Sequence, residues 1–143
     1  MKKGVTLLLA VFISTIAISL GLGIFAIIFG ELKISGSAKE SLIALYAADS
    51  GVECALYWDL AEGAFSITSP PASVNCVGDD HPVVFDAPFS RFTFDVQLTE
   101  SDSCAHVRVE KPSEVTTVTA LGENTGCGSA SARTVQRGFE VKY

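Results

Sequence analysis

Four cysteines and two histidines carry most of the reactive side-chain chemistry in this chain, and their spacing fits neither catalysis nor metal binding. A zinc site needs closely spaced ligands such as Cys-x-x-Cys, and the sequence contains no such pair. His81 is expected in a loop before Pro82, and His106 on the solvent side of a strand, opposite Val107. No Gly-x-Ser-x-Gly turn marks a nucleophile. We therefore expect a protein that is not an enzyme and has no catalytic residue, metal or cofactor.

Acidic clusters are the next residues that could do chemistry, because carboxylates bind calcium. They occur at Asp79-Asp80 and at Glu100-Ser101-Asp102. A calcium loop places oxygen ligands at alternating positions around a glycine turn, and both clusters lack that pattern. We interpret them as solvated loop charges. Five phenylalanines are interpreted as core residues rather than a binding patch, namely Phe65, Phe85, Phe89, Phe92 and Phe94.

The stretch that organises the chain is residues 5–29, which contain no charged residue and no proline. A bilayer core needs about 20 consecutive apolar residues in a helix, so the stretch predicts a membrane-spanning helix. A secretory signal peptide has a shorter apolar region, of about 7–15 residues, and a small-x-small cleavage site. Here the run is longer and helical spacing continues beyond it. The alternative is a plain signal anchor, a helix that only holds the chain in the membrane and has no additional function.

Charge predicts the orientation of the chain and excludes one class of partner. Lys2 and Lys3 precede the apolar stretch, and positive residues stay on the cytoplasmic side, so the C-terminal part is expected outside. The formal net charge is −6, and it becomes −8 if a leader with both lysines is removed. Nucleic-acid binding depends on Lys and Arg that neutralise phosphates. We expect no direct binding of nucleic acid.

Helical spacing continues through residues 31–62 despite Gly36 and Gly51. One apolar face is predicted from spacings of three and four, and its members are Leu42, Leu45, Ala48, Val52, Ala55 and Leu56. A second apolar face contains Ile43, Ala47, Cys54 and Trp58. Two apolar faces need two packing partners. We expect one face to pack on the chain's own domain and the other to be available to copies of the same helix.

Residues 63–143 are expected to form a small β domain. Residues 66–80 are rich in Ser, Pro, Asn and Asp and predict a loop. Strands are predicted over residues 82–85, 92–98, 105–111, 116–121 and 134–142, because apolar residues alternate there or β-branched residues are frequent. The predicted fold class is α+β, a long N-terminal helix packed on a small C-terminal antiparallel sheet.

Four cysteines in an exported domain predict two disulfides. Cys104 opens a predicted strand and Cys127 lies in the loop between the last two strands, which favours their pairing. Cys54 would then bond Cys76 and attach the loop to the helix. Each closed loop of some two dozen residues is worth about 3 kcal/mol in the chain-entropy model. Four cysteines allow three connectivities, and the sequence does not choose among them.

Three motifs resemble one family. Lys2-Lys3-Gly4 before the apolar run looks like a class III prepilin leader, and AADSGV at residues 47–52 is similar to an Ala-Ala-Glu-x-Gly segment late in the helix of that family. TALG at 119–122 and ARTV at 132–135 are similar to its last two strands. The chain thus resembles type IV pilins and related pseudopilins, above all the PilX-type minor pilins. The first 60 or so residues carry the most specific part of the resemblance.

The resemblance implies a pilin-like fold and a specific processing route. Prepilin peptidase would cut after Gly4, and Val5 would become N-methylated. The implied organisation is a leader (1–4), a transmembrane and filament-core helix (5–30), its amphipathic continuation (31–62) and an extracytoplasmic β domain (63–143). The implied partners are the peptidase, the inner membrane before assembly, and other pilin subunits through the N-terminal helix. The implied function is that of a structural subunit of an extracellular filament.

Two departures from the family pattern refine this expectation. Major pilins carry Glu at the fifth mature position, where this chain has Leu9, which favours a minor or tip subunit. Many pilins have a proline in the membrane helix; here Gly21 and Gly23 could take its role, so we expect residues 21–30 to be less ordered in a filament. Two alternatives remain open, a single-pass membrane-anchored binding domain and a pseudopilin of a secretion or DNA-uptake machine.

Overall fold

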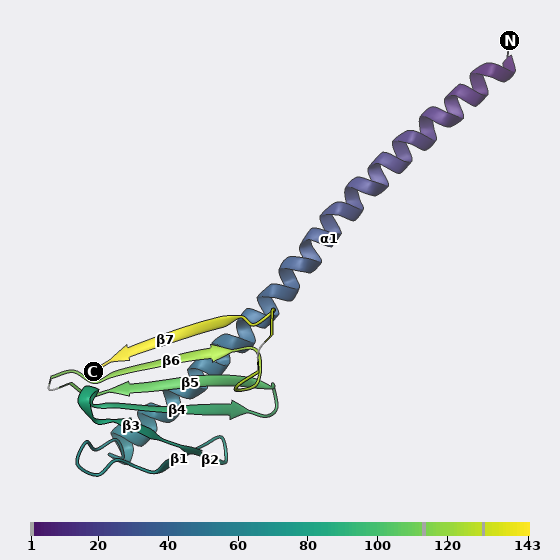
Figure 1. Cartoon of the computed structure of the whole chain (residues 1–143). Coiled ribbons are helices and arrows are strands. Elements are labelled where there is room, and N and C mark those ends of the chain that lie inside the picture. Colours follow the sequence, from purple (N-terminus) through teal and green to yellow (C-terminus); the bar gives the residue numbers. More distant parts are fainter. Residues whose placement is uncertain (1, 113, 130) are drawn as a thin grey trace. The chain divides into compact units, whose positions relative to one another are not determined.

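The computed structural model describes residues 2–112, 114–129 and 131–143, with side chains from Gly4 onward. A single long helix, α1 (Lys2–Leu56), is followed by one π-helical turn, η1 (Tyr57–Ala61), and then by strands (Figure 1). The chain divides into two units, Met1–Ala38 and Lys39–Tyr143. The second unit therefore contains the last part of α1 together with every strand.

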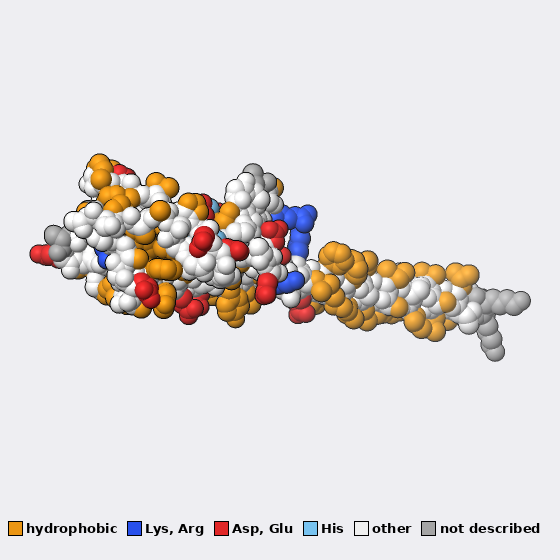
Figure 2. Space-filling view, turned by 90° about the horizontal axis from the view of Figure 1, so that it is seen from below, with side chains coloured by type: hydrophobic (Ala, Val, Ile, Leu, Met, Phe, Trp, Pro, Cys, Tyr) orange, Lys and Arg blue, Asp and Glu red, His pale blue; other side chains and the backbone are white. Residues whose placement is uncertain are grey.

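The part of α1 in the first unit has no buried residue from Gly4 onward. Figure 2 shows apolar side chains along the visible face of this segment. Its most apolar window has a mean hydropathy of 2.5, so by length and composition α1 could cross a membrane. Hydroxyls in the segment donate to carbonyls of their own helix: Ser14 to that of Val11, Thr15 to that of Phe12, and Ser19 to that of Ile16. These bonds remove donors that lipid would leave unsatisfied.

The second unit contains a five-stranded sheet in which every neighbouring pair is antiparallel and follows chain order. Its strands are β3 (Val84–Asp86), β4 (Arg91–Leu98), β5 (Ser103–Glu110), β6 (Thr117–Glu123) and β7 (Gln136–Lys142). A short 3-10 turn, η2 (Ala87–Phe89), connects the first two of these strands. A separate hairpin joins β1 (Ser73–Cys76) to β2 (Asp79–Pro82). The predicted α+β layout is confirmed.

The inner face of the sheet packs on α1, and small residues fill the centre of the contact. On the helix the buried positions are Ala44, Ala47, Ala48, Gly51, Val52 and Ala55. A Cβ atom on Gly51 would lie 2.9 Å from both Ala105 Cβ and Val107 Cγ2. A Cβ atom on Gly122 would collide with the helix backbone at Ala44 and Ala48. Helix and sheet therefore approach closely because neither side carries bulk there.

Larger side chains form the rest of the core. Alternation in β4 and β5 buries Phe92, Phe94, Val107 and Val109, as predicted. Phe65, from the segment after η1, is also buried, and its ring stacks on that of Phe94 at an interplanar angle of 15°. Fully burying one such side chain contributes about 1.5–3 kcal/mol. The core thus joins helix, sheet and the connecting segment in one cluster.

The prediction of a loop over residues 66–80 is wrong, because the segment includes β1 and part of β2. Val77 and Gly78 form the hairpin turn with φ of 56° and 89°. Turn residues and short exposed strands have similar compositions, which hid the hairpin in the sequence. The predicted strand 82–85 is also corrected, since β2 ends at Pro82 and β3 begins at Val84.

The predicted apolar faces of the helix also need correction. Leu42 was assigned to the first face, but its side chain is 51% exposed. The real buried face runs between the two predicted ones, because the close approach of the sheet selects Ala and Gly rather than Leu. The second predicted face is not free for copies of the helix. Cys54 is bonded to Cys76 in β1, and Trp58 Nε1 donates a hydrogen bond of 2.9 Å to the Asn75 carbonyl.

Candidate assembly and processing surfaces

Gly4 and Val5, the expected processing residues, lie in the first turns of α1. Both are exposed, and no atom would lie within 4 Å of a Cβ added to Gly4. Leu9, at the position where a carboxylate would be expected in a major pilin, is 57% exposed. Among the residues that the structure describes, then, nothing covers the expected cleavage point.

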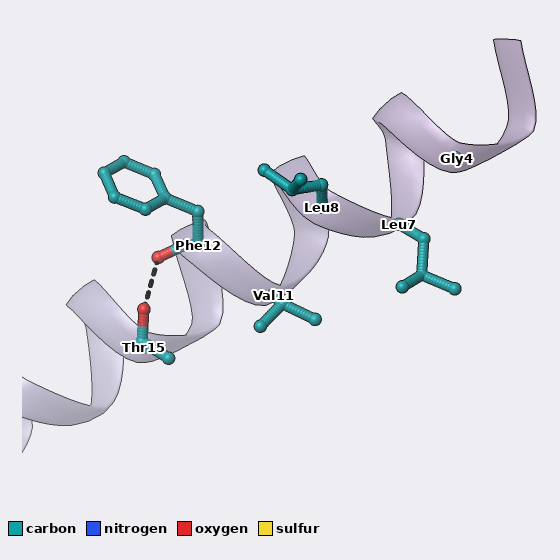
Figure 3. Close-up of a pocket in the computed structure, with 6 residues that line it drawn as sticks. All are labelled: Gly4, Leu7, Leu8, Val11, Phe12 and Thr15. Carbon is teal, nitrogen blue, oxygen red and sulfur yellow. Dashed lines mark hydrogen bonds between the residues drawn. The ribbon is translucent and has the colours of Figure 1, made fainter. Parts of the chain in front are cut away.

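An apolar depression of about 450 Å³ follows one face of α1 from this point (Figure 3). The residues that line it recur at spacings of three and four, and they are Gly4, Leu7, Leu8, Val11, Phe12 and Thr15. The Thr15 hydroxyl is its main polar group, and it donates a bond of 2.8 Å to the Phe12 carbonyl (Figure 3). The depression is an elongated, mostly apolar surface, and such a surface can pack against an acyl chain or another apolar helix.

A second exposed surface lies on α1 and η1 within the Lys39–Tyr143 unit. We call it the helix stripe, and it consists of Leu42, Tyr46, Asp49, Glu53, Tyr57 and Leu60, all exposed and on one side of the helix by their spacing. The Tyr57 hydroxyl donates a 3.0 Å hydrogen bond to Glu62 Oε1. This hydrogen bond, then the charge of Glu62, raises the pKa of Tyr57. The stripe combines two acidic positions with four apolar or aromatic ones.

The two disulfides are Cys54–Cys76 and Cys104–Cys127, the pairing that the sequence favoured without deciding it. Their Cα atoms are 5.9 Å and 4.9 Å apart. The first fixes the β1–β2 hairpin on α1. The second holds the β6–β7 loop on β5, and the Cys127 amide also donates a 2.6 Å hydrogen bond to Gln97 Oε1 in β4. A separate hairpin and the loop between the last two strands are thus fixed covalently.

The Lys39–Tyr143 unit contains a buried polar centre around Asp59 that the sequence analysis missed. Asp59 in η1 is only 8% exposed. It forms an ion pair with Lys111 and accepts a 2.6 Å hydrogen bond from the Tyr143 hydroxyl. Burial, followed by the hydrogen bond to Asp59 and its negative charge, raises the pKa of Tyr143. The signal that could have found Asp59 is its spacing of four from buried Ala55.

The two histidines occupy different environments. His81 was expected in a loop but is buried in β2, with Nε2 3.2 Å from the Cys76 carbonyl oxygen. His106 lies on the outer face of the sheet, the side turned away from α1, as predicted. Its Nδ1 is 2.6 Å from Asp95 Oδ1, and its Nε2 is 3.8 Å from Glu123 Oε2. It can therefore link strands β4, β5 and β6.

The acidic clusters are not brought together as a cation site. Asp79 and Asp80 lie in β2 rather than in a loop, and Asp80 accepts a 3.0 Å hydrogen bond from Asn75 Nδ2. Asp102 is in the turn between β4 and β5, with φ of 46°. Over residues 2–112, 114–129 and 131–143, no three His, Cys, Asp or Glu side chains are arranged to hold a metal ion.

One phenylalanine assigned to the core is on the surface. Phe89 is 63% exposed, and its ring lies against the Arg91 guanidinium, with 5.0 Å from Cζ to the ring centroid. The turn η2 carries Phe89 out of the alternating pattern of the strands, which explains the wrong assignment.

No family model, no curated protein and no solved structure matches this chain.

Proposed function

We propose that the chain is a structural subunit of a type IV pilus or a related extracellular filament, processed after Gly4 and assembled through α1. One observation carries the proposal. A single helix, Lys2–Leu56, includes an uncharged, largely apolar segment just after Lys2 and Lys3 and also forms the helical layer of a small disulfide-bonded domain.

The apolar segment must be shielded from water by lipid or protein, and this requirement supports assembly through α1. Each large apolar side chain that leaves water contributes about 1.5–3 kcal/mol, so the segment is stable only in lipid or against other apolar helices. A helix that is apolar on every side can exchange lipid for protein neighbours without exposing a polar face. The basic leader is the one part that such an exchange could not bury, and cleavage after Gly4 would remove it.

The Lys39–Tyr143 unit supports an extracytoplasmic location for the rest of the chain. Both of its disulfides are typical of oxidising compartments. The helix stripe gives the unit an exposed surface on the same helix, where further contacts between subunits could form. Leu9 in place of an acidic residue favours a minor or tip position, because the subunit lacks the carboxylate that would meet a neighbour's amino terminus.

The test is the intact mass and N-terminal sequence of the protein isolated from its native cells, together with its recovery in sheared surface filaments. We expect a chain that begins at N-methylated Val5. Gly4→Val should leave the leader attached and remove the protein from filaments. Gly36→Val is the matched control, because Gly36 is also helical and a Cβ there meets nothing within 4 Å. It should be processed normally.

The second candidate is a single-pass membrane-anchored binding domain. The observation that favours it is that the core and the two disulfides of the Lys39–Tyr143 unit form within one chain. A native chain that still begins at Met1 or Lys2 would contradict the filament proposal and favour this one. A processed chain absent from sheared filaments would instead indicate a pseudopilin of a secretion or DNA-uptake machine.

A further inference from the structure

The outer face of the five-stranded sheet contains one cation without a counter-charge, Arg108. It lies in β5, directly opposite Thr93 in β4 and Thr119 in β6. Directly paired residues of neighbouring strands point to the same side of a sheet, so the Arg108 side chain leaves the sheet on the same face as the two threonine side chains. Arg108 is exposed, whereas the two threonines are half-buried.

The carboxylates around Arg108 each have another side-chain partner. Glu110 accepts a 2.8 Å bond from Arg91, and Glu140 is 2.7 Å from Lys142. Asp95 Oδ1 is 2.6 Å from His106 Nδ1. Within the part of the chain that the structure describes, the Arg108 guanidinium has no ion pair or hydrogen bond, and the same holds for the hydroxyls of Thr93 and Thr119. Three donor groups, the guanidinium and the two hydroxyls, therefore lie on one face of the sheet without a hydrogen-bond partner in the described residues.

These donors line a hollow in the sheet surface. Its volume is about 130 Å³, and its walls include Thr93, Asp95, Arg108, Thr119 and Leu121. A second hollow of about 200 Å³ shares Thr93 and Asp95 and adds the apolar walls Pro82 and Val84. The first hollow offers a guanidinium fork, hydroxyls, a carboxylate oxygen and an apolar wall. The second extends that surface along the sheet.

We propose that this outer sheet face binds an acidic saccharide, with the carboxylate of one uronate residue on Arg108. An arginine fork matches a planar carboxylate with two parallel hydrogen bonds. Sugar hydroxyls can accept from Thr93 and Thr119 and donate to the second oxygen of Asp95, while the ring's apolar side contacts Leu121. A phosphate dianion fits less well, because Asp95 lies in the same hollow and the chain carries a net charge of −6.

This site does not depend on the proposed filament, since the residues that line it lie in strands β2 to β6 and none lies in α1. It serves an anchored domain as well as a filament subunit. A negative result for processing after Gly4 would therefore leave it standing, and a negative result for saccharide binding would leave the filament proposal standing.

The experiment is a titration of the full chain in nanodiscs of neutral lipid with sodium glucuronate, followed by amide and arginine side-chain NMR signals at constant ionic strength. Saturable shifts are expected at Thr93, Asp95, Arg108 and Thr119, with a dissociation constant of about a millimolar, as for a shallow site with few contacts. Uncharged glucose, at the same concentrations, should bind at least about tenfold more weakly because it lacks the charge-assisted pair.

Arg108→Gln should weaken glucuronate binding at least about tenfold, because it removes the fork and the charge. Arg133→Gln is the control, since it removes the charge of an exposed arginine in the loop between β6 and β7 that lines neither hollow, and it should leave the dissociation constant within about twofold. Unchanged amide dispersion would verify that each variant is folded. Equal binding by Arg108→Gln and the unmodified protein, equal binding of glucose, or the absence of saturation would each overturn the assignment.

Discussion

Gly122 of β6 lies against the backbone of Ala44 in α1 so closely that no Cβ atom fits between them. The contact shows how closely β6 approaches the helix at this point. Because the obstacle is backbone on the helix side, a side chain at residue 122 cannot be accommodated by a rotamer change. The helix and the strand would have to separate.

Gly122→Ala is therefore expected to lower the free energy of unfolding by at least about 1–3 kcal/mol, the usual cost of overpacking. Denaturant unfolding of the full chain in detergent measures this change. Gly36→Ala is the control, since nothing would lie within 4 Å of its Cβ, and helix propensity predicts a small gain in stability of up to about 1 kcal/mol. An unfolding free energy for Gly122→Ala equal to that of the unmodified protein would show that the helix and sheet are not held this closely.

The buried Asp59 centre predicts a second large effect. Asp59→Ala should destabilise the unit by about 3–5 kcal/mol, because it leaves the Lys111 ammonium partly buried without its counter-charge. Replacing one member of an exposed pair provides the comparison: Glu140→Gln should change the free energy of unfolding by less than about 1 kcal/mol. Chemical denaturation of both variants under one set of conditions makes the test. If Asp59→Ala lowered the free energy of unfolding as little as Glu140→Gln does, the ion pair between Asp59 and Lys111 would be solvated.

The same centre predicts a pH dependence through Tyr143. Its pKa is raised above the ordinary value of 10.0 by burial and by Asp59, so the folded state holds a proton that the unfolded state releases. The resulting stabilisation is complete below about pH 10 and is lost as the pH rises above it, by up to about 1.4 kcal/mol per pH unit. The free energy of unfolding, measured from pH 8 to 11, should decline less steeply for Tyr143→Phe than for the unmodified protein. Tyr46→Phe, at an exposed position, should keep the original slope; a slope unchanged in Tyr143→Phe would refute the assignment.

Periodic signals in the sequence predicted the layout well, because α1 and strands β4 and β5 repeat their apolar residues over many positions. The β1–β2 hairpin was missed, since Ser73 to Pro82 has the composition of a loop and its position depends on Cys54 and Trp58 far along the chain. Asp59 was missed for a related reason: Lys111 and Tyr143 reach it only in the folded unit. The isolated charge of Arg108 became visible only when strand register identified its neighbours.

The helix stripe predicts which side of the folded unit contacts other subunits if the chain assembles as proposed. Leu42 and Tyr46 are 51% and 66% exposed and make no contribution to the core. The double substitution Leu42→Glu with Tyr46→Glu should leave folding intact and reduce recovery in sheared filaments at least about tenfold, because charge would enter an apolar contact. Val84→Glu is the matched control, being 64% exposed in the edge strand β3, and should assemble normally. If the double variant assembles as well as the control, the stripe faces solvent in the filament and the contacts are confined to the apolar segment of α1.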